Sequence, residues 1–354
     1  MTDHRLVFVG GLHRSGTTPL TRCLAAHSQI SGFEGTGVEE DEGQHLQNVY
    51  PPARAHGGPG RFALHPAAHL TEGSPLLTPD TATRLLDQWR PHWDLARPVL
   101  VEKSPPNLLM TRFLQGAFPD ARFVMVVRHP AIVSLSTRKW ARLRSLGALL
   151  DHWFAAHRLF EEDAPFLHHL LVVKYEHLVA DPERTLAEIA AFLELDGDLP
   201  TGGIDTRRSA TYERQWADLS HGGPWRRERF RALCRRHEPA ANHFGYSLLD
   251  LHRADPFPVG GGAAGQGSTS RYRRIRSSGD DDADRGRPMK DSASASGLGP
   301  RARPSRRQRG DRTHSSLPSG SARTVQVTFP WPTSALVAPR ARRRATSAAG
   351  SSPG

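Results

Sequence analysis

Short runs of apolar, often β-branched residues alternate along the first 250 residues with longer stretches whose apolar residues recur at helical spacing. The strand-like runs are residues 5–9, 98–101, 122–127 and 170–173. The helix-like stretches are residues 18–26, 79–90, 105–117, 130–143, 147–163, 182–194 and 225–238. Continuous apolar runs are typical of strands buried on both faces. The alternation predicts an α/β fold: a parallel sheet flanked by helices on both faces.

Two segments interrupt this alternation. Residues 31–76 are rich in Gly, Pro and His and form a long irregular excursion, and excursions of that length usually carry function. From residue 256 onwards Gly, Ser, Ala, Pro and Arg dominate, and little periodic apolar content is left. Such a composition buries too little surface to offset its ordering entropy. We therefore predict an α/β domain over residues 1–255 and a low-complexity, disordered basic tail over residues 256–354.

Charge is divided unevenly between these two parts. The 354 residues carry a net charge of +11, and residues 256–354 hold 18 Lys and Arg against 6 Asp and Glu. The domain is thus nearly neutral, which is not the pattern of a basic nucleic-acid-binding domain. The arginines of the tail have few aromatic residues between them, so we do not expect nucleic acid as a partner. A basic arm for nucleic acid or anionic lipid, and an extension without a selected role, stay open for the tail.

The lengths of the apolar runs and the number of cysteines indicate where the protein is located and whether it binds a metal. No apolar run approaches the ~18–20 residues of a membrane-spanning helix, so we expect no membrane span. The polar start and the short run Leu6–Val9 do not form a secretory signal. Cys23 and Cys234 give neither a disulfide framework nor zinc spacing. We expect a cytoplasmic protein that requires no metal.

A glycine-bounded loop joins the first predicted strand to the first predicted helix. It reads Gly11-Leu-His-Arg-Ser-Gly16-Thr-Thr, so a helix N-terminus there offers free N–H groups to an anion. The glycine spacing is that of a P-loop, but Thr17 stands where a Walker A loop has Lys. With Arg14 and without that Lys, the loop suits a 5′-anion with no obligatory magnesium. An ordinary strand–turn–helix with a Ser/Thr cap is the structural alternative.

Here the chain resembles a known family. The string GLHRSGTTPLTRCLAAH resembles the 5′-phosphosulfate loop of the PAPS-dependent sulfotransferases, in particular their bacterial, Golgi-type and protein-tyrosine branches. VMVVRHPAIVSLS carries Arg128 and Ser136 at the spacing of the family's second signature. VVKYEHLVADPERTL, VEKSPPN and FGYSL are similar to further family segments. The similarity spans roughly residues 5–250 and none of the tail. It implies an enzyme that transfers a sulfuryl group from PAPS to an acceptor hydroxyl by in-line displacement and releases PAP.

The resemblance also implies two anion sites, one for each end of PAPS. Arg128 and Ser136 would hold the 3′-phosphate, for which Arg offers a fixed fork of donors. Tyr175 would lie near the adenine. Taken singly, a surface ion pair, a solvated helix residue and a core tyrosine remain the structural alternatives for these three. The loop residues that would hold the 5′-phosphosulfate are Arg14, Ser15, Gly16, Thr17 and Thr18.

Sulfuryl transfer needs positive groups near the leaving oxygen and a base for the acceptor proton. Arg14 and Lys103 are the candidates for the leaving oxygen. Glu34 is the candidate base, because its position relative to the loop comes within one residue of the glutamate used by the tyrosine-sulfating branch. The rival bases are Glu39, Glu40, Asp41, His45 and His13.

Two other functions compete with this interpretation. One is a small-molecule P-loop kinase, against which the missing Walker Lys argues, as does Arg128 at the end of the third strand where a kinase would have an acid. The other is a non-catalytic nucleotide- or nucleic-acid-binding protein that uses its tail. For a sulfotransferase, the expected acceptor is a hydroxyl of a carbohydrate, a glycolipid or a secondary metabolite, with a protein tyrosine as a further candidate. Residues 31–76 would shape its pocket.

Overall fold

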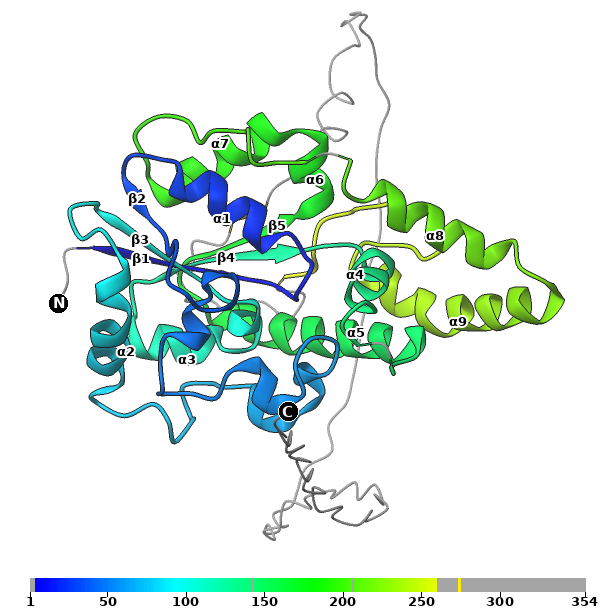
Figure 1. The fold of residues 1–354 in the computed structure, drawn as a ribbon, viewed down its shortest axis with the longest axis horizontal. Helices are drawn as coiled ribbons and strands as arrows, with labels where there is room; N and C mark the ends of the chain where they lie inside the picture. The colour runs from blue at the N-terminus through cyan, green and yellow to red at the C-terminus, as the bar shows by residue number, and fades with distance from the viewer. Residues whose placement is uncertain (1–3, 142, 206, 260–272, 275–354) are drawn as a thin grey trace, which may run out of the picture. The chain divides into compact units, whose positions relative to one another are not determined.

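A parallel sheet organises the fold (Figure 1). The computed structural model describes residues 4–141, 143–205, 207–259 and 273–274. The chain divides into the units 1–287 and 288–354, and the second unit lies outside the described residues. Within the first unit the strand order is β2-β3-β1-β4-β5-β6, with every pair parallel. The strands are β1 Arg5–Gly10, β2 Ile30–Ser31, β3 Val99–Lys103, β4 Arg122–Val127, β5 Leu170–Lys174 and β6 Arg273–Arg274.

Helices cover both faces of this sheet, which confirms the predicted fold class. In Figure 1, α1, α6 and α7 lie on one face and α2, α3 and α5 on the other, while α8 and α9 pack against each other beyond α4. The α-helices are α1 Thr17–Ala25, α2 Thr81–Trp89, α3 Thr111–Ala117, α4 Pro130–Thr137, α5 Leu146–Asp163, α6 Tyr175–Ala180, α7 Pro182–Leu193, α8 Ala210–Ser220 and α9 Pro224–His243. The 3₁₀ turns are η1 Glu39–Asp41, η2 Gly43–His45, η3 Ala53–His56, η4 Phe62–Leu64, η5 Pro66–Ala68, η6 Arg90–His92, η7 Pro105–Leu109 and η8 Ala164–Phe166.

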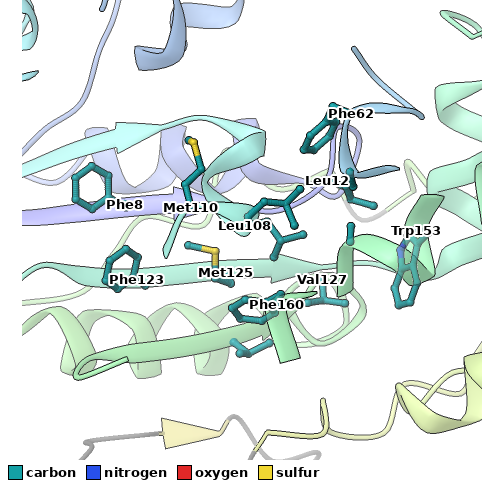
Figure 2. Close-up of a cluster of buried hydrophobic side chains, with 14 of the residues drawn as sticks. Phe8, Leu12, Phe62, Leu108, Met110, Phe123, Met125, Val127, Trp153 and Phe160 are labelled. Carbon is teal, nitrogen blue, oxygen red and sulfur yellow. The ribbon is translucent and has the colours of Figure 1, made fainter. Parts of the chain in front are cut away.

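Alternating residues of the central strand β1 enter two separate cores. Val7 and Val9 pack into the core beneath α1 and α7, whereas Phe8 packs into the core on the opposite face. Figure 2 shows Phe8 and Phe123 in that second core, which also holds Phe160 of α5. The rings of Phe8 and Phe123 stack with their centroids 5.7 Å apart. A strand buried on both faces needs a continuous apolar run, and this is why the sequence pattern located β1 correctly.

Several predicted elements differ in extent. The stretch predicted as one helix over residues 105–117 is broken at Met110, whose φ of −131° ends η7 before α3 begins. α4 ends at Thr137, earlier than predicted, whereas α9 continues to His243 through Pro239. β2, α6 and α8 were not predicted. β2 has only two residues, and α6 begins directly where β5 ends, so neither produces a periodic pattern of its own.

The core extends slightly beyond the predicted domain boundary. Phe257 is 2% exposed, and its ring centroid lies 5.4 Å from that of Phe244 and 5.5 Å from that of Phe160. The change in composition near residue 256 therefore precedes the last core residue. Of the tail predicted as disordered, residues 256–259 and the β6 pair are described. The rest of that prediction lies outside the described residues.

Four histidines predict a loss of stability in acid. Burial lowers the pKa of His129 to about 4 and the pKa values of His13, His152 and His157 to about 3. An unfolded histidine has a pKa of about 6.5. Between these values the unfolded chain binds protons that the folded chain excludes, so the free energy of unfolding falls as the pH falls. Each such histidine contributes a slope of about 1.4 kcal/mol per pH unit.

We expect the Tm measured by calorimetry to fall steeply as the pH is lowered from 7 to 4.5. The variant His157→Gln removes one of the four titrating groups and should flatten that dependence. An unchanged pH dependence in this variant would assign acid unfolding to other groups.

Candidate functional site

The carboxyl ends of four neighbouring strands bring the predicted residues to one edge of the sheet. The glycine-bounded loop follows β1, Lys103 ends β3, Arg128 follows β4 and Tyr175 follows β5. Ligands of open parallel sheets bind at this edge. A cavity of about 350 Å³ lies there. Ser15, Ser136 and Lys103 are buried and lie outside its lining. The predicted residues that line it are Arg14, Gly16, Thr17, Thr18, Arg128 and Tyr175.

Two glycines let the loop fit tightly between β4 and Tyr175. Gly11 has a φ of +143°, and a Cβ there would lie 2.3 Å from the carbonyl oxygen of Val126. Gly16 has a φ of +103°, and a Cβ there would lie 2.3 Å from the ring of Tyr175. No side chain among the described residues caps the helix that starts at Thr17. Its first N–H groups are therefore left without a capping side chain, as expected for a loop that binds an anion.

Arg128 is a buried cation that forms no ion pair with any described carboxylate. The residue is 4% exposed. Its Nη1 donates to the carbonyl oxygen of Arg14 at 3.0 Å, and its Nη2 donates to Ser209 Oγ at 2.6 Å. The guanidinium carbon lies 4.1 Å from the ring centroid of Tyr175. The buried Nε has no hydrogen-bond partner among the described residues. Because a buried charge needs compensation, this arrangement suits a bound anion.

Arg14 joins the two regions that sequence analysis assigned to separate phosphates. Its φ is +75°, an uncommon value for a residue with a Cβ. Its Nε donates to Ser136 Oγ at 2.8 Å, and Ser136 in turn donates to the hydroxyl of Tyr212 at 3.1 Å. The guanidinium lies 5.0 Å from the ring centroid of Trp140. Arg14 therefore reaches from the loop after β1 to the helix after β4.

Lys103 contacts an acidic residue that sequence analysis did not select. Its Nζ donates to the carbonyl oxygen of Glu40 at 2.7 Å and to Glu42 Oε1 at 3.2 Å. Glu42 lines the cavity although only 6% of it is exposed. Burial raises the pKa of its carboxyl group, and the charge of Lys103 opposes that rise. A carboxylate of the cavity lining is thus paired with a lysine that lies outside the lining.

The predicted base Glu34 does not lie at the cavity. It is exposed and lies outside the lining of the cavity. Asp41 holds a turn, since it accepts hydrogen bonds from the backbone N–H and the hydroxyl of Thr36 at 2.8 and 2.7 Å. The rival bases that do line the cavity are Glu39, Glu40, His45 and His13. Burial lowers the pKa of His13 to about 3, with Lys103 adding to this effect, so this imidazole is a weak base.

Further cationic residues of the cavity were missed by sequence analysis. Arg208, which precedes α8, and Arg54, which lies in η3, both line it. Their sequence signal is weak because arginines are common in this chain, and only the path of the folded chain brings these two to the sheet edge. Among the described residues, no group of three His, Cys, Asp or Glu side chains could hold a metal ion. None of the described helices has the length and hydrophobicity of a membrane span.

Comparisons with known proteins match the sequence of this chain to one family. The profile described as "Sulfotransferase family" matches residues 7–198. Protein-tyrosine sulfotransferase 2 of Gallus gallus is 27% identical over 197 residues, which are 53% of this chain and 50% of that protein. Protein-tyrosine sulfotransferase 1 of Danio rerio is 27% identical over 201 residues, which are 54% of each chain. The chain spans about half the length of the curated relatives it matches.

Among solved structures, sulfotransferase STF9 from Mycobacterium avium aligns with a TM-score of 0.42 and 13% identity, over 70% of this chain and 79% of that one. The family profile covers more than half of the chain and includes the loop after β1, Lys103, Arg128, Ser136 and Tyr175. The chain therefore belongs to the sulfotransferase family.

Proposed function

We propose that this chain transfers a sulfuryl group from PAPS to an acceptor hydroxyl and releases PAP. The observation that carries the proposal is the buried guanidinium of Arg128, which has an unpartnered Nε and no described carboxylate as ion-pair partner. It lies at the same cavity as the uncapped N-terminus of α1. One cavity thus offers two separate anion sites, as a nucleotide with a 5′-phosphosulfate and a 3′-phosphate requires.

The residues of the cavity fit the two ends of PAPS. Arg128, which lines the cavity, and Ser136, which is buried outside its lining, would bind the 3′-phosphate, and Arg208 adds a second cation to the lining. The loop from Arg14 to Thr18 would bind the 5′-phosphosulfate, for which the buried hydroxyl of Ser15 has no other partner among the described residues. Tyr175 also lines the cavity and would lie near the adenine, although the residue is 1% exposed and its ring packs against Gly16 and Arg128.

Glu42 is better suited than Glu34 to accept the proton of the acceptor hydroxyl. It lines the cavity, and burial raises the pKa of its carboxyl group, which favours proton transfer. PAPS supplies the sulfuryl group when bound. Arg14 and Lys103 would then stabilise the negative charge that develops on the leaving oxygen, since both are cations at the same edge of the sheet.

The relatives give the first acceptor to test. Two of them are named protein-tyrosine sulfotransferases. A tyrosine hydroxyl is therefore a candidate acceptor, in addition to hydroxyls of carbohydrates, glycolipids and secondary metabolites. The excursion of residues 31–76 also lines the cavity and supplies His45 and Arg54. These residues would contact the acceptor, if the loop and Arg128 hold the nucleotide as proposed.

A thermal-shift panel tests the proposed function without a known acceptor. We expect PAP and PAPS to raise the Tm of the full chain, by roughly 5–10 °C at a concentration 100 times their Kd. Adenosine 5′-phosphosulfate should shift the Tm less, because it lacks the 3′-phosphate that Arg128 would bind. Stabilisation by ATP or GTP alone would support a kinase instead, and stabilisation by DNA alone would support a nucleic-acid-binding protein.

A further inference from the structure

A buried carboxyl group lies directly behind the Glu42–Lys103 pair and takes no part in the chemistry proposed above. Glu102 precedes Lys103 on β3 and is 1% exposed. Because side chains alternate along a strand, Glu102 points to the face of Leu100 and Lys103 to the face of Val101. These two faces belong to the two separate cores. The end of β3 therefore carries an acidic side chain, Glu102, on one face and a basic side chain, Lys103, on the other.

Both oxygens of Glu102 accept hydrogen bonds from side chains of the segment that follows β3. Ser104 Oγ donates to Oε1 at 2.5 Å, and Asn107 Nδ2 donates to Oε2 at 2.5 Å. Asn107 Nδ2 also donates to the carbonyl oxygen of Val9, just before the loop that would hold the 5′-phosphosulfate. Burial raises the pKa of Glu102 to about 7, although these two donors oppose the rise. Glu102 is thus held by hydrogen bonds at both carboxyl oxygens.

The same network continues into the excursion that carries Glu42. Ser104 Oγ accepts a hydrogen bond from the backbone N–H of Gln44 at 2.9 Å. The side chain of Gln44 donates to Glu42 Oε2 at 2.5 Å and accepts from the N–H of Ala53 at 2.8 Å. Gly43 fits against Glu102 so closely that a Cβ there would lie 2.3 Å from Oε1. The segment 42–44 is thus held on both faces of β3: by Lys103 on one and by Glu102 with Ser104 on the other.

We propose that Glu102 is a positioning residue that fixes Glu42 at the cavity through Ser104 and Gln44. This inference rests on the proposed function for its effect on turnover, but its structural part does not. Glu102 acts by accepting hydrogen bonds and not by its charge. A side chain of similar shape without oxygens leaves Ser104 and Asn107 without an acceptor. A glutamine keeps one acceptor oxygen for Asn107, and its amide can donate to Ser104 Oγ.

The first test measures the position of the excursion without any substrate. In hydrogen–deuterium exchange of the full chain, Glu102→Met and Ser104→Ala should each speed exchange of the amides of residues 42–46 by roughly fivefold to tenfold, the worth of one net hydrogen bond. Glu102→Gln should keep these amides close to wild type. The β4 peptide over residues 122–127 serves as an internal reference. Equal exchange at residues 42–46 in wild type, Glu102→Met and Ser104→Ala would overturn the proposal.

The matched control is Glu238→Met in α9. Glu238 also accepts two hydrogen bonds, from Ser247 Oγ at 2.6 Å and from the N–H of Leu248 at 2.7 Å, but it lies outside the cavity lining. The variant Glu238→Met should lower the Tm without changing hydrogen–deuterium exchange at residues 42–46. Should Glu102→Met fail to fold, Ser104→Ala alone carries the same comparison.

The second test links position to turnover. Ser104→Ala and Glu102→Met should lower kcat for PAPS-dependent transfer by roughly 10–100-fold, as expected for a displaced reacting group, and leave the Kd of PAP unchanged. The double variant should lose no more than the larger single loss, because both substitutions break one network. Normal kcat together with faster exchange would overturn the positioning role. A wild-type chain that binds no PAP would instead refute the proposed function and leave the exchange result standing.

Discussion

Arg128→Ala should weaken the binding of PAP and PAPS by on the order of 2–5 kcal/mol, which is roughly 30-fold to several-thousand-fold in Kd. The reason is that the substitution removes a desolvated, forked donor from the 3′-phosphate. Adenosine 5′-phosphosulfate, which has no 3′-phosphate, should lose far less. Isothermal titration calorimetry with the three nucleotides measures the difference. Arg128→Lys should fall between wild type and Arg128→Ala, because it keeps the charge but loses the fork.

The contact between Arg128 and the carbonyl oxygen of Arg14 makes a second explanation testable in the same experiment. If Arg128 mainly supports the loop, all three nucleotides should lose affinity equally. Arg84→Ala, at an exposed position of α2, changes the net charge by the same amount at a site outside the cavity lining. It should leave all three affinities unchanged.

Glu42→Gln should lower the rate of sulfuryl transfer by roughly 10²–10⁴, the usual worth of a positioned general base. The amide keeps the shape of the side chain and can still accept the hydrogen bond from Lys103, but it cannot take up a proton. The Kd of PAP should stay near that of wild type, since Glu42 faces the acceptor in the proposed arrangement. The acidic limb of the pH–rate profile, which reports protonation of the base, should disappear.

Glu34→Gln is the competing variant. The exposed position of Glu34 outside the cavity lining leads us to expect a rate close to wild type. A large loss of rate in Glu34→Gln with a normal rate in Glu42→Gln would return the role of base to Glu34. Loss of PAP binding in Glu42→Gln would show that this residue supports the nucleotide site and not the acceptor.

The sequence predicted the sheet well because its strands are buried on both faces. β4 was located to the residue, since Arg122–Val127 is apolar throughout its interior. The helices were placed less accurately at their ends, where local contacts decide. α4 stops at Thr137, although the helical pattern continues to residue 143, and this end was not visible in the pattern. The buried position of Phe257 was hidden by the change in composition that begins beside it.

The candidate site was predictable where it lies next to a strand. The loop after β1, Arg128 and Tyr175 all follow strand ends, and strand ends are visible in the sequence. The excursion of residues 31–76 adjoins no strand that the sequence predicted, so the positions of its residues could not be predicted in this way. Four acidic residues follow one another from Glu39 to Glu42, and only the end of β3 decides which of them is buried. Glu42 was therefore not distinguished from its neighbours by spacing or composition.

The hydrogen bond from Arg128 to the carbonyl oxygen of Arg14 has a consequence for how the two anion sites respond to each other. Arg14 also donates to Ser136, so each proposed anion site contains a group that is hydrogen-bonded to a group of the other. If both sites bind as proposed, occupying one changes the partners available at the other, and the two affinities are thermodynamically linked. Linkage is reciprocal: the factor by which a 5′-anion changes the affinity for a 3′-phosphate equals the factor in the opposite direction. The coupling free energy between the two sites, together with the contacts at each, then decides how a molecule that carries both anionic groups binds compared with two separate anions.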